Sequence, residues 1–146
     1  MEGSGKACWP YLKSNGVEFS VLGISVKGLL EALQIDEALA HIDTGFDGFL
    51  LLSEEKYRRI GLHLSELSRR YWPEGETVTG ELLKLRRALA IIQVPKLGLN
   101  FEGYVDTFHG STENLAGLRL IEGLKLLLDG PARLVASQYK RGPAKF

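Results

Sequence analysis

The chain has 146 residues, a length typical of one domain rather than two. Its 18 Lys and Arg residues are balanced by 18 Asp and Glu residues, so neither nucleic acid nor an anionic membrane is an expected partner. The single cysteine cannot form an internal disulfide, which favours a reducing compartment. The sequence also lacks a signal-like start and any apolar run near the roughly 20 residues of a spanning helix, so we expect a cytoplasmic, soluble protein.

The first half of the chain is expected to contain strands on both sides of a glycine-containing loop. β-branched and aromatic residues recur near period two in 17–26, which predicts a strand. The apolar runs 38–42 and 49–52 predict two buried strands. The loop 43–48 between them contains two glycines, which give its backbone freedom to turn.

A short helix is predicted directly after these strands. Ser53 is a good N-cap, and the two glutamates that follow it suit the positive end of the helix dipole. Arg58 and Arg59 suit the negative end, and Gly61 closes the helix, which we therefore place at Glu54–Ile60.

The second half is expected to repeat this plan. We predict a turn at 72–76, a long β-rich segment at 77–94 and a strand at 99–108. A short helix at 118–122 and two further strands at 124–128 and 133–136 follow. The predicted fold class is mostly β, a half-barrel with one or two short helices and two similar halves. We assign 17–137 to this domain, 1–16 to an N-terminal extension and 138–146 to a basic, flexible tail.

Two short strings in the two halves resemble each other. HIDTGFDG occupies 41–48 and YVDTFHG occupies 104–110. A duplicated half would produce such an echo, but strings of seven or eight residues also match by chance, which is the simpler explanation.

The triplet Asp43-Thr44-Gly45 carries most of the functional information. An apolar strand precedes it, and a second apolar strand and a capped helix follow it. In this order, ALAHIDTGFDGFLLLSEEKYRRIGL resembles the first hallmark of the retropepsin-like aspartic peptidases, in particular their single-domain microbial members. The family's second hallmark is two apolar residues and a glycine, then a short helix and a strand ending in Asp. Leu115-Ala116-Gly117 and the residues up to Asp129 resemble it.

The resemblance implies an aspartic endopeptidase of retropepsin-like fold, with Asp43 as its catalytic carboxylate. Peptide hydrolysis needs a base that activates water and an acid that protonates the leaving amine. Two carboxylates about 3 Å apart share one proton and supply both, because like charges so close cannot both ionise. The chain has one Asp-Thr-Gly triplet, so the family's solution is a symmetric homodimer with Asp43 of each copy at the axis. Thr44 is expected to hydrogen-bond across that axis, and Gly45 to let the two loops approach closely.

The same resemblance implies roles for residues around the substrate, a peptide or protein, and implies no metal or organic cofactor. A flap hairpin over the cleft is expected from Tyr71 to Thr77, at the turn Trp72-Pro73-Glu74-Gly75-Glu76, although Trp72 suits the core equally well. Phe46 stands where the family has a small residue, so it is expected to narrow the cleft or to form a pocket wall. Leu115, Ala116 and Gly117 are expected to support the catalytic loop.

Four other interpretations stay open. A retropepsin-like dimer without activity would serve as a peptide- or protein-binding module, and Asp43 in a plain Asx-turn would have no chemistry. Asp106-Thr107 would offer a second site within one chain, but Phe108 replaces its glycine. A metal-dependent hydrolase would draw on His41 and Asp43, which alternate on one strand face, with His63, His109 and Asp106 to complete the site. No two of these histidines have a helical ligand spacing.

Three arginine pairs look at first like a nucleic-acid signal. They occur at 58–59, 69–70 and 86–87, and acidic residues lie close to them in the sequence. We therefore interpret the pairs as solvated faces and expect no nucleic-acid partner.

Overall fold

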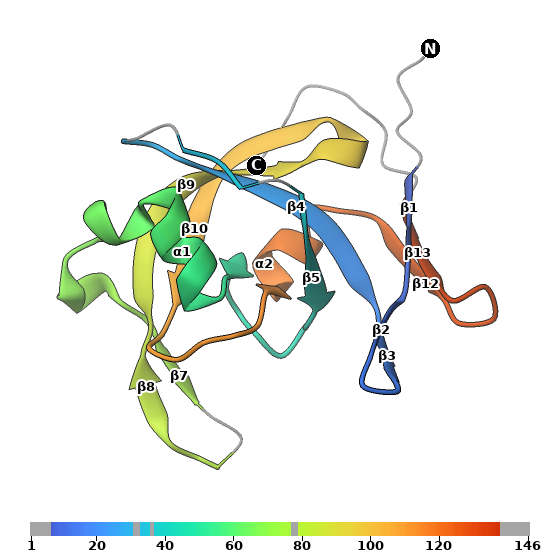
Figure 1. The fold of residues 1–146 in the computed structure, drawn as a ribbon, viewed down its shortest axis with the longest axis horizontal. Helices are drawn as coiled ribbons and strands as arrows, with labels where there is room; N and C mark the ends of the chain where they lie inside the picture. The colour runs from blue at the N-terminus through green and yellow to red at the C-terminus, as the bar shows by residue number, and fades with distance from the viewer. Residues whose placement is uncertain (1–6, 31–32, 36, 77–78, 138–146) are drawn as a thin grey trace.

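A closed barrel of six strands forms the centre of the molecule (Figure 1). The computed structural model describes residues 7–30, 33–35, 37–76 and 79–137. The barrel has the strand order β10-β6-β11-β5-β4-β9. In chain order its strands are β4 (Val21–Gly28), β5 (Ala38–Ile42), β6 (Leu50–Leu51), β9 (Arg86–Val94), β10 (Leu99–Thr107) and β11 (Leu115–Ala116). The expected mostly β fold class is confirmed, and the strands close completely.

Smaller elements surround the barrel. β1 (Ala7–Pro10), β13 (Leu134–Ser137) and β12 (Leu126–Asp129) form a three-stranded sheet in that order. Two hairpins are formed by β2 (Leu12–Ser14) with β3 (Val17–Phe19) and by β7 (Glu74–Glu76) with β8 (Leu82–Lys84). The β7–β8 hairpin projects away from the barrel (Figure 1).

The helices are short. Among the described residues, the α-helices are α1 (Glu54–Ile60) and α2 (Leu118–Ile121), and 3-10 turns occur at Leu62–Leu64, Arg69–Tyr71 and Pro95–Leu97. In the described part of the chain, none of them has the length and apolar character that a membrane crossing requires.

Helix α1 has the predicted bounds and caps. The Ser53 hydroxyl accepts a hydrogen bond from the Lys56 N–H at 3.3 Å. Gly61 ends the helix in the left-handed conformation with φ 89°, which glycine adopts without the strain of a side chain. Tyr57 and Ile60 are buried and anchor the helix on the core.

The barrel consists of two halves with the same arrangement. β4, β5, β6 and α1 form the first half, and β9, β10, β11 and α2 form the second. The two long strands of each half pair antiparallel, and the short strand that follows pairs in parallel with a long strand of the other half. The expected two similar halves are confirmed.

The cross-pairing shows which residues of the two halves lie on the same face of the barrel wall. Leu50 pairs with Val105 in β10 and also with Ala116, which pairs with Ile42 in β5, so Val105 and Ile42 lie on one face. Leu51 pairs with Asp106 and also with Leu115, which pairs with His41, so Asp106 and His41 lie on the other face.

Asp43, two positions beyond His41, continues this second face and therefore lies on the same face as Asp106. The echo between the two sequence strings, which aligns Asp43 with Asp106, agrees with this arrangement. The two carboxylates differ in burial, since Asp106 is fully buried whereas Asp43 is partly exposed.

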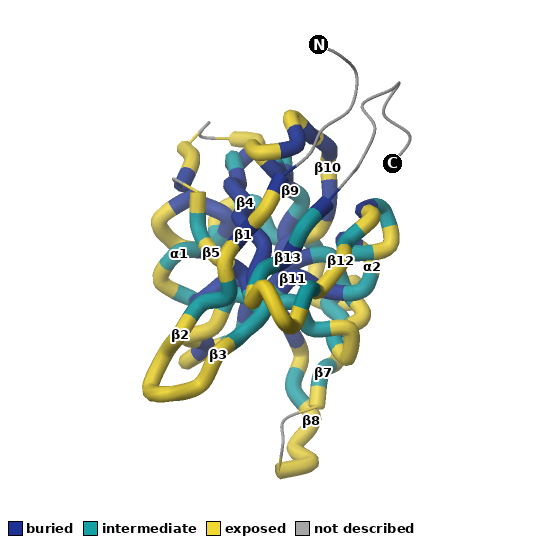
Figure 2. Tube along the Cα trace, turned by 90° about the vertical axis from the view of Figure 1, so that its right-hand side faces the viewer, coloured by how far each residue is buried: buried dark blue, intermediate teal, exposed yellow. Residues whose placement is uncertain are grey.

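Residues assigned from the sequence to an N-terminal extension contribute to the core. β1 pairs antiparallel with β13, and within β1 the indole of Trp9 is only 2% exposed. Lys96 donates a hydrogen bond to the carbonyl oxygen of Cys8 at 2.7 Å, which ties β1 to the turn between β9 and β10. Figure 2 shows the buried residues gathered in the barrel strands, with the hairpins exposed at the periphery.

Replacement of Trp9 by Ala should lower the free energy of unfolding by about 3–5 kcal/mol, because it leaves a cavity where a large aromatic ring was buried. Val17→Ala is the control, since Val17 is 53% exposed and should change stability by less than about 0.5 kcal/mol. Urea unfolding followed by circular dichroism measures both. Equal effects of the two changes would show that β1 is not part of the folded unit.

Candidate active site

Asp43 follows the last residue of β5 and begins a tight turn. Its backbone N–H donates to the carbonyl oxygen of Ala116 at 3.0 Å, which continues the strand pairing to the start of the loop. Its carboxylate Oδ1 accepts from the Gly45 N–H at 2.9 Å, and its carbonyl accepts from the Phe46 N–H at 3.2 Å. The carboxylate is half-buried, and Thr44 and Gly45 at the turn are exposed. The loop therefore presents a carboxylate in a defined position.

The residues that follow β11 hold the other end of this loop. Backbone N–H groups donate to loop carbonyls at 2.9, 2.8 and 3.1 Å, from Gly117 to Phe49, from Leu118 to Phe46 and from Arg119 to Gly48. A Cβ atom on Gly117 would collide with the carbonyl oxygen of Gly48, so only glycine permits this approach. Ala116 and Gly117 thus lie where the sequence placed the support of the loop, and Leu115 lies in the wall of the cavity beside it.

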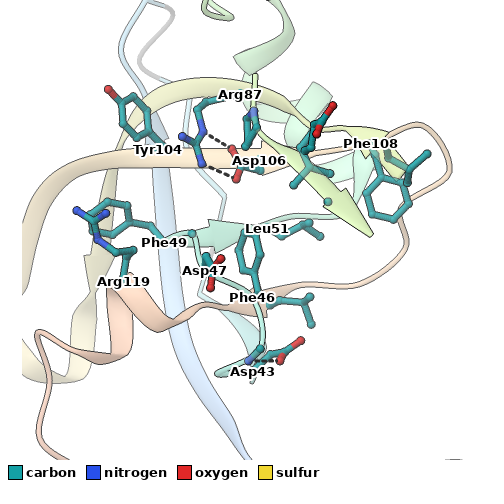
Figure 3. A pocket seen from close by; sticks show the side chains of 18 of the residues that line it. Asp43, Phe46, Asp47, Phe49, Leu51, Arg87, Tyr104, Asp106, Phe108 and Arg119 are labelled. Carbon is teal, nitrogen blue, oxygen red and sulfur yellow. Dashed lines mark hydrogen bonds and ion pairs between the residues drawn. The ribbon is translucent and has the colours of Figure 1, made fainter. Parts of the chain in front are cut away.

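A cavity of about 810 Å³ adjoins Asp43 (Figure 3). The loop contributes Asp43, Gly45, Phe46, Asp47, Gly48 and Phe49 to its wall. The β7–β8 hairpin contributes Pro73, Glu74, Gly75, Glu76 and Leu83, and the barrel contributes Leu51, Leu85, Arg87, Tyr104 and Asp106. Phe108, Leu115 and Arg119 complete it. The structure thus brings the Asp43 loop and four of the five predicted flap residues to one cavity.

The hairpin lies further along the chain than the predicted flap. Glu74 pairs with Lys84, so the strands of the hairpin are 74–76 and 82–84. Trp72 precedes them, and its indole N–H donates to the carbonyl oxygen of Leu67 at 2.9 Å. The side chain of Trp72 therefore braces the base of the hairpin, while Thr77 falls outside the described residues.

A buried ion pair in the cavity wall was not expected from the sequence. Arg87 donates to both carboxylate oxygens of Asp106, from Nε at 2.8 Å and from Nη2 at 3.0 Å. The guanidinium also lies over the ring of Tyr104, 4.7 Å from its centroid. Burial raises the pKa of Asp106, and the hydrogen bonds from Arg87 oppose that rise. Arg87 therefore does not lie on a solvated face, as its sequence context had indicated.

A sequence signal for this pair did exist. Arg87 and Asp106 are directly opposite each other in the antiparallel pair β9–β10. Pairing the residues of the two strands outwards from the turn at 95–98 places Arg87 opposite Asp106. Opposite charges at paired positions attract, so the ion pair could have been expected.

The histidines lie in separate surroundings. His41 stacks on Phe19 with ring centroids 4.4 Å apart, and the imidazole of His109 is 99% exposed. Asp106 is bound to Arg87. Over the described ranges, no three His, Cys, Asp or Glu side chains come together as metal ligands would.

Comparisons with known proteins identify one relative by sequence. No protein-family model matches the chain. An uncharacterised protein of Archaeoglobus fulgidus is 35% identical over 92 residues, which are 62% of this chain and 69% of that protein. The chain belongs to the family of this archaeal protein. Among solved structures, the retroviral protease-like domain of Ddi1 from Leishmania major is similar to the present chain, with a TM-score of 0.49 and 13% identity. The similarity covers 88% of this chain and 99% of that domain.

Replacement of Arg87 by Met should cost about 3–5 kcal/mol at pH 7, because Asp106 would remain as a buried charge without a partner. The loss should shrink as the pH falls. Without Arg87 the pKa of Asp106 rises further, so the folded state binds a proton more tightly than the unfolded state and gains stability in acid. Urea unfolding at pH 7 and pH 4 measures the effect.

The matched control for this prediction is the double variant Arg87→Met/Asp106→Leu. It removes both charges and should recover most of the lost stability. A single variant whose loss of stability is the same at both pH values would contradict the assignment of the effect to Asp106.

Proposed function

We propose that this chain is a retropepsin-like aspartic peptidase whose active site forms between two copies in a homodimer. The placement of Asp43 carries the proposal. Its half-buried carboxylate lies in the wall of the cavity, in a loop held at both ends by backbone hydrogen bonds. The β7–β8 hairpin contributes another wall of the same cavity, where a peptide would be enclosed.

The chemistry requires a second carboxylate beside Asp43. One carboxylate accepts a proton from water, which attacks the peptide carbonyl, and the other donates a proton to the leaving nitrogen. Asp106 resembles Asp43 in sequence, but Arg87 engages both of its oxygens. Because both oxygens of Asp106 are hydrogen-bonded to Arg87 in the cavity wall, we assign the second catalytic carboxylate to Asp43 of another copy.

The exposed part of the loop suits such an arrangement. Thr44 and Gly45 are exposed immediately beside the carboxylate, so a second copy of the loop can approach them. Around a two-fold axis the same residues face each other from both copies, and each copy then supplies one carboxylate. The substrate is an extended peptide or a segment of a protein.

The edge strand β12 supports the homodimer independently. It lies at the end of the order β1-β13-β12, and within it Leu127 and Leu128 are 62% and 49% exposed. Exposed apolar edge strands pair readily, and native proteins cover or block them. We propose that a second copy covers β12.

Cleavage of a mixed peptide pool between about pH 3 and 8, followed by mass spectrometry, tests the activity. The wild type should cleave and Asp43→Asn should not, because an amide cannot exchange the proton. Glu113→Gln is the control, since it neutralises an exposed carboxylate that does not line the cavity and should still cleave. Cleavage that persists in Asp43→Asn would overturn the assignment of Asp43, and no cleavage by the wild type would favour a binding module without activity.

Replacement of Leu127 by Lys should shift the protein from dimer to monomer and abolish cleavage at the same time, because a charge on the edge strand opposes pairing. Light scattering measures the mass in solution. Leu64→Lys serves as the control, since Leu64 is 59% exposed and lies outside β12. A Leu127→Lys variant that remains dimeric would refute this placement of the interface.

A further inference from the structure

The ring of Phe46 rests on two glycines in the cavity wall. A Cβ atom on Gly48 would lie 2.7 Å from its Cζ, and one on Gly117 would lie 2.6 Å from its Cδ2. Both distances are far shorter than a carbon–carbon contact of about 3.5–4.0 Å. The ring therefore fills the space that a side chain on either glycine would occupy.

The backbone of Phe46 is held on both sides. Its N–H donates to the carbonyl of Asp43 at 3.2 Å, and its carbonyl accepts from the Leu118 N–H at 2.8 Å. These bonds fix the Cα of Phe46 relative to the Asp43 loop. The bonds therefore set the point at which the Phe46 side chain leaves the backbone, in the wall of the cavity.

A polar layer lies behind Gly48. The Oδ2 atom of Asp106 is 3.2 Å from the position of a Cβ on that glycine, and Asp106 is bound to Arg87. Figure 3 shows the Phe46 ring between Asp43 on one side and the Arg87–Asp106 pair on the other. A substrate side chain that enters this part of the cavity contacts the Phe46 ring first. Behind the ring lies the charged Arg87–Asp106 pair rather than an apolar space.

We propose that Phe46 closes the subsite next to Asp43, so that the substrate residue beside the cleaved bond must be small, such as Gly, Ala or Ser. This inference rests on the proposed peptidase function and names the substrate class of that site. Phe46 is a specificity-determining residue, because it limits the volume of the subsite and takes no part in the transfer of protons.

A set of peptides that differ only in the residues flanking one bond tests the inference. The wild type should cleave peptides with Gly, Ala or Ser at one flanking position at least about 10-fold faster than those with Leu or Phe there. In Phe46→Ala this preference should reverse, and in Phe46→Leu it should weaken. Phe19→Ala is the matched control, since Phe19 stacks on His41 outside the cavity and its loss should leave the size preference unchanged.

A binding measurement separates this inference from the proposed activity. Fluorescence anisotropy with the same peptides compares Asp43→Asn with Asp43→Asn/Phe46→Ala, and neither variant needs to cleave. Tighter binding of the small-residue peptides by Asp43→Asn, lost in the double variant, supports the inference even where the wild type cleaves nothing. Thermal unfolding verifies that each protein is folded. If Asp43→Asn/Phe46→Ala does not fold, Asp43→Asn/Phe46→Leu takes its place.

Two results would overturn the inference. One is that the wild type cleaves peptides with small and large residues at equal rates and that Asp43→Asn binds them with equal affinity. The other is a size preference that stays the same in folded Phe46→Ala and Phe46→Leu. If the wild type cleaves without any size preference, the peptidase proposal survives and only the role of Phe46 fails.

Discussion

The backbone hydrogen bonds between the Asp43 loop and residues 116–119 are the constraint on which the candidate site depends. A loop that contains two glycines has many accessible conformations, and ordering each residue costs about 1–2 kcal/mol of conformational entropy. The bonds from 116–119 offset part of that cost and leave the loop one position. Gly117 is essential to the arrangement, because the carbonyl of Gly48 lies where its side chain would be. Without this contact, the carboxylate would have no defined orientation toward the cavity.

The two halves of the barrel explain why these distant segments meet. Each short strand leaves its own half and pairs in parallel with a strand of the other, so β11 brings residues 116–119 beside the end of β5. The two Asp-Thr pairs have different surroundings. Asp43 follows its strand and lies in a loop of the cavity wall, whereas Asp106 lies within its strand and is buried with Arg87. One carboxylate is available for chemistry, and the other stabilises the wall.

The cavity combines a rigid floor with an exposed hairpin. The barrel strands β9 and β10 pair over nine residues and carry the ion pair, so this side has little freedom to move. The β7–β8 hairpin pairs over only three residues and projects from the body, which leaves it few contacts that would resist displacement. A peptide enclosed between them would be shaped by the floor and covered by the hairpin. Phe46 lines the same cavity, and under the proposal made above its bulk limits the substrate side chain beside Asp43.

The sequence by itself determined the local features of this protein. Strand periodicity, the caps at Ser53 and Gly61 and the Asp43 triplet all act within a few residues, so they can be read in order along the chain. The mostly β class, the bounds of α1 and the two similar halves followed from them. The support of the loop by Ala116 and Gly117 came from the resemblance to a family, since no local pattern connects these segments.

Only the tertiary structure decided which distant residues meet. The Arg87–Asp106 pair depends on the register of two long strands, and a shift of one residue would have turned Asp106 to the other face. The position of the hairpin and the burial of Trp9 also depend on pairing between distant segments. Composition and local periodicity specify what each segment can form, whereas register and packing specify which side chains share a cavity, because those contacts join residues far apart in the chain.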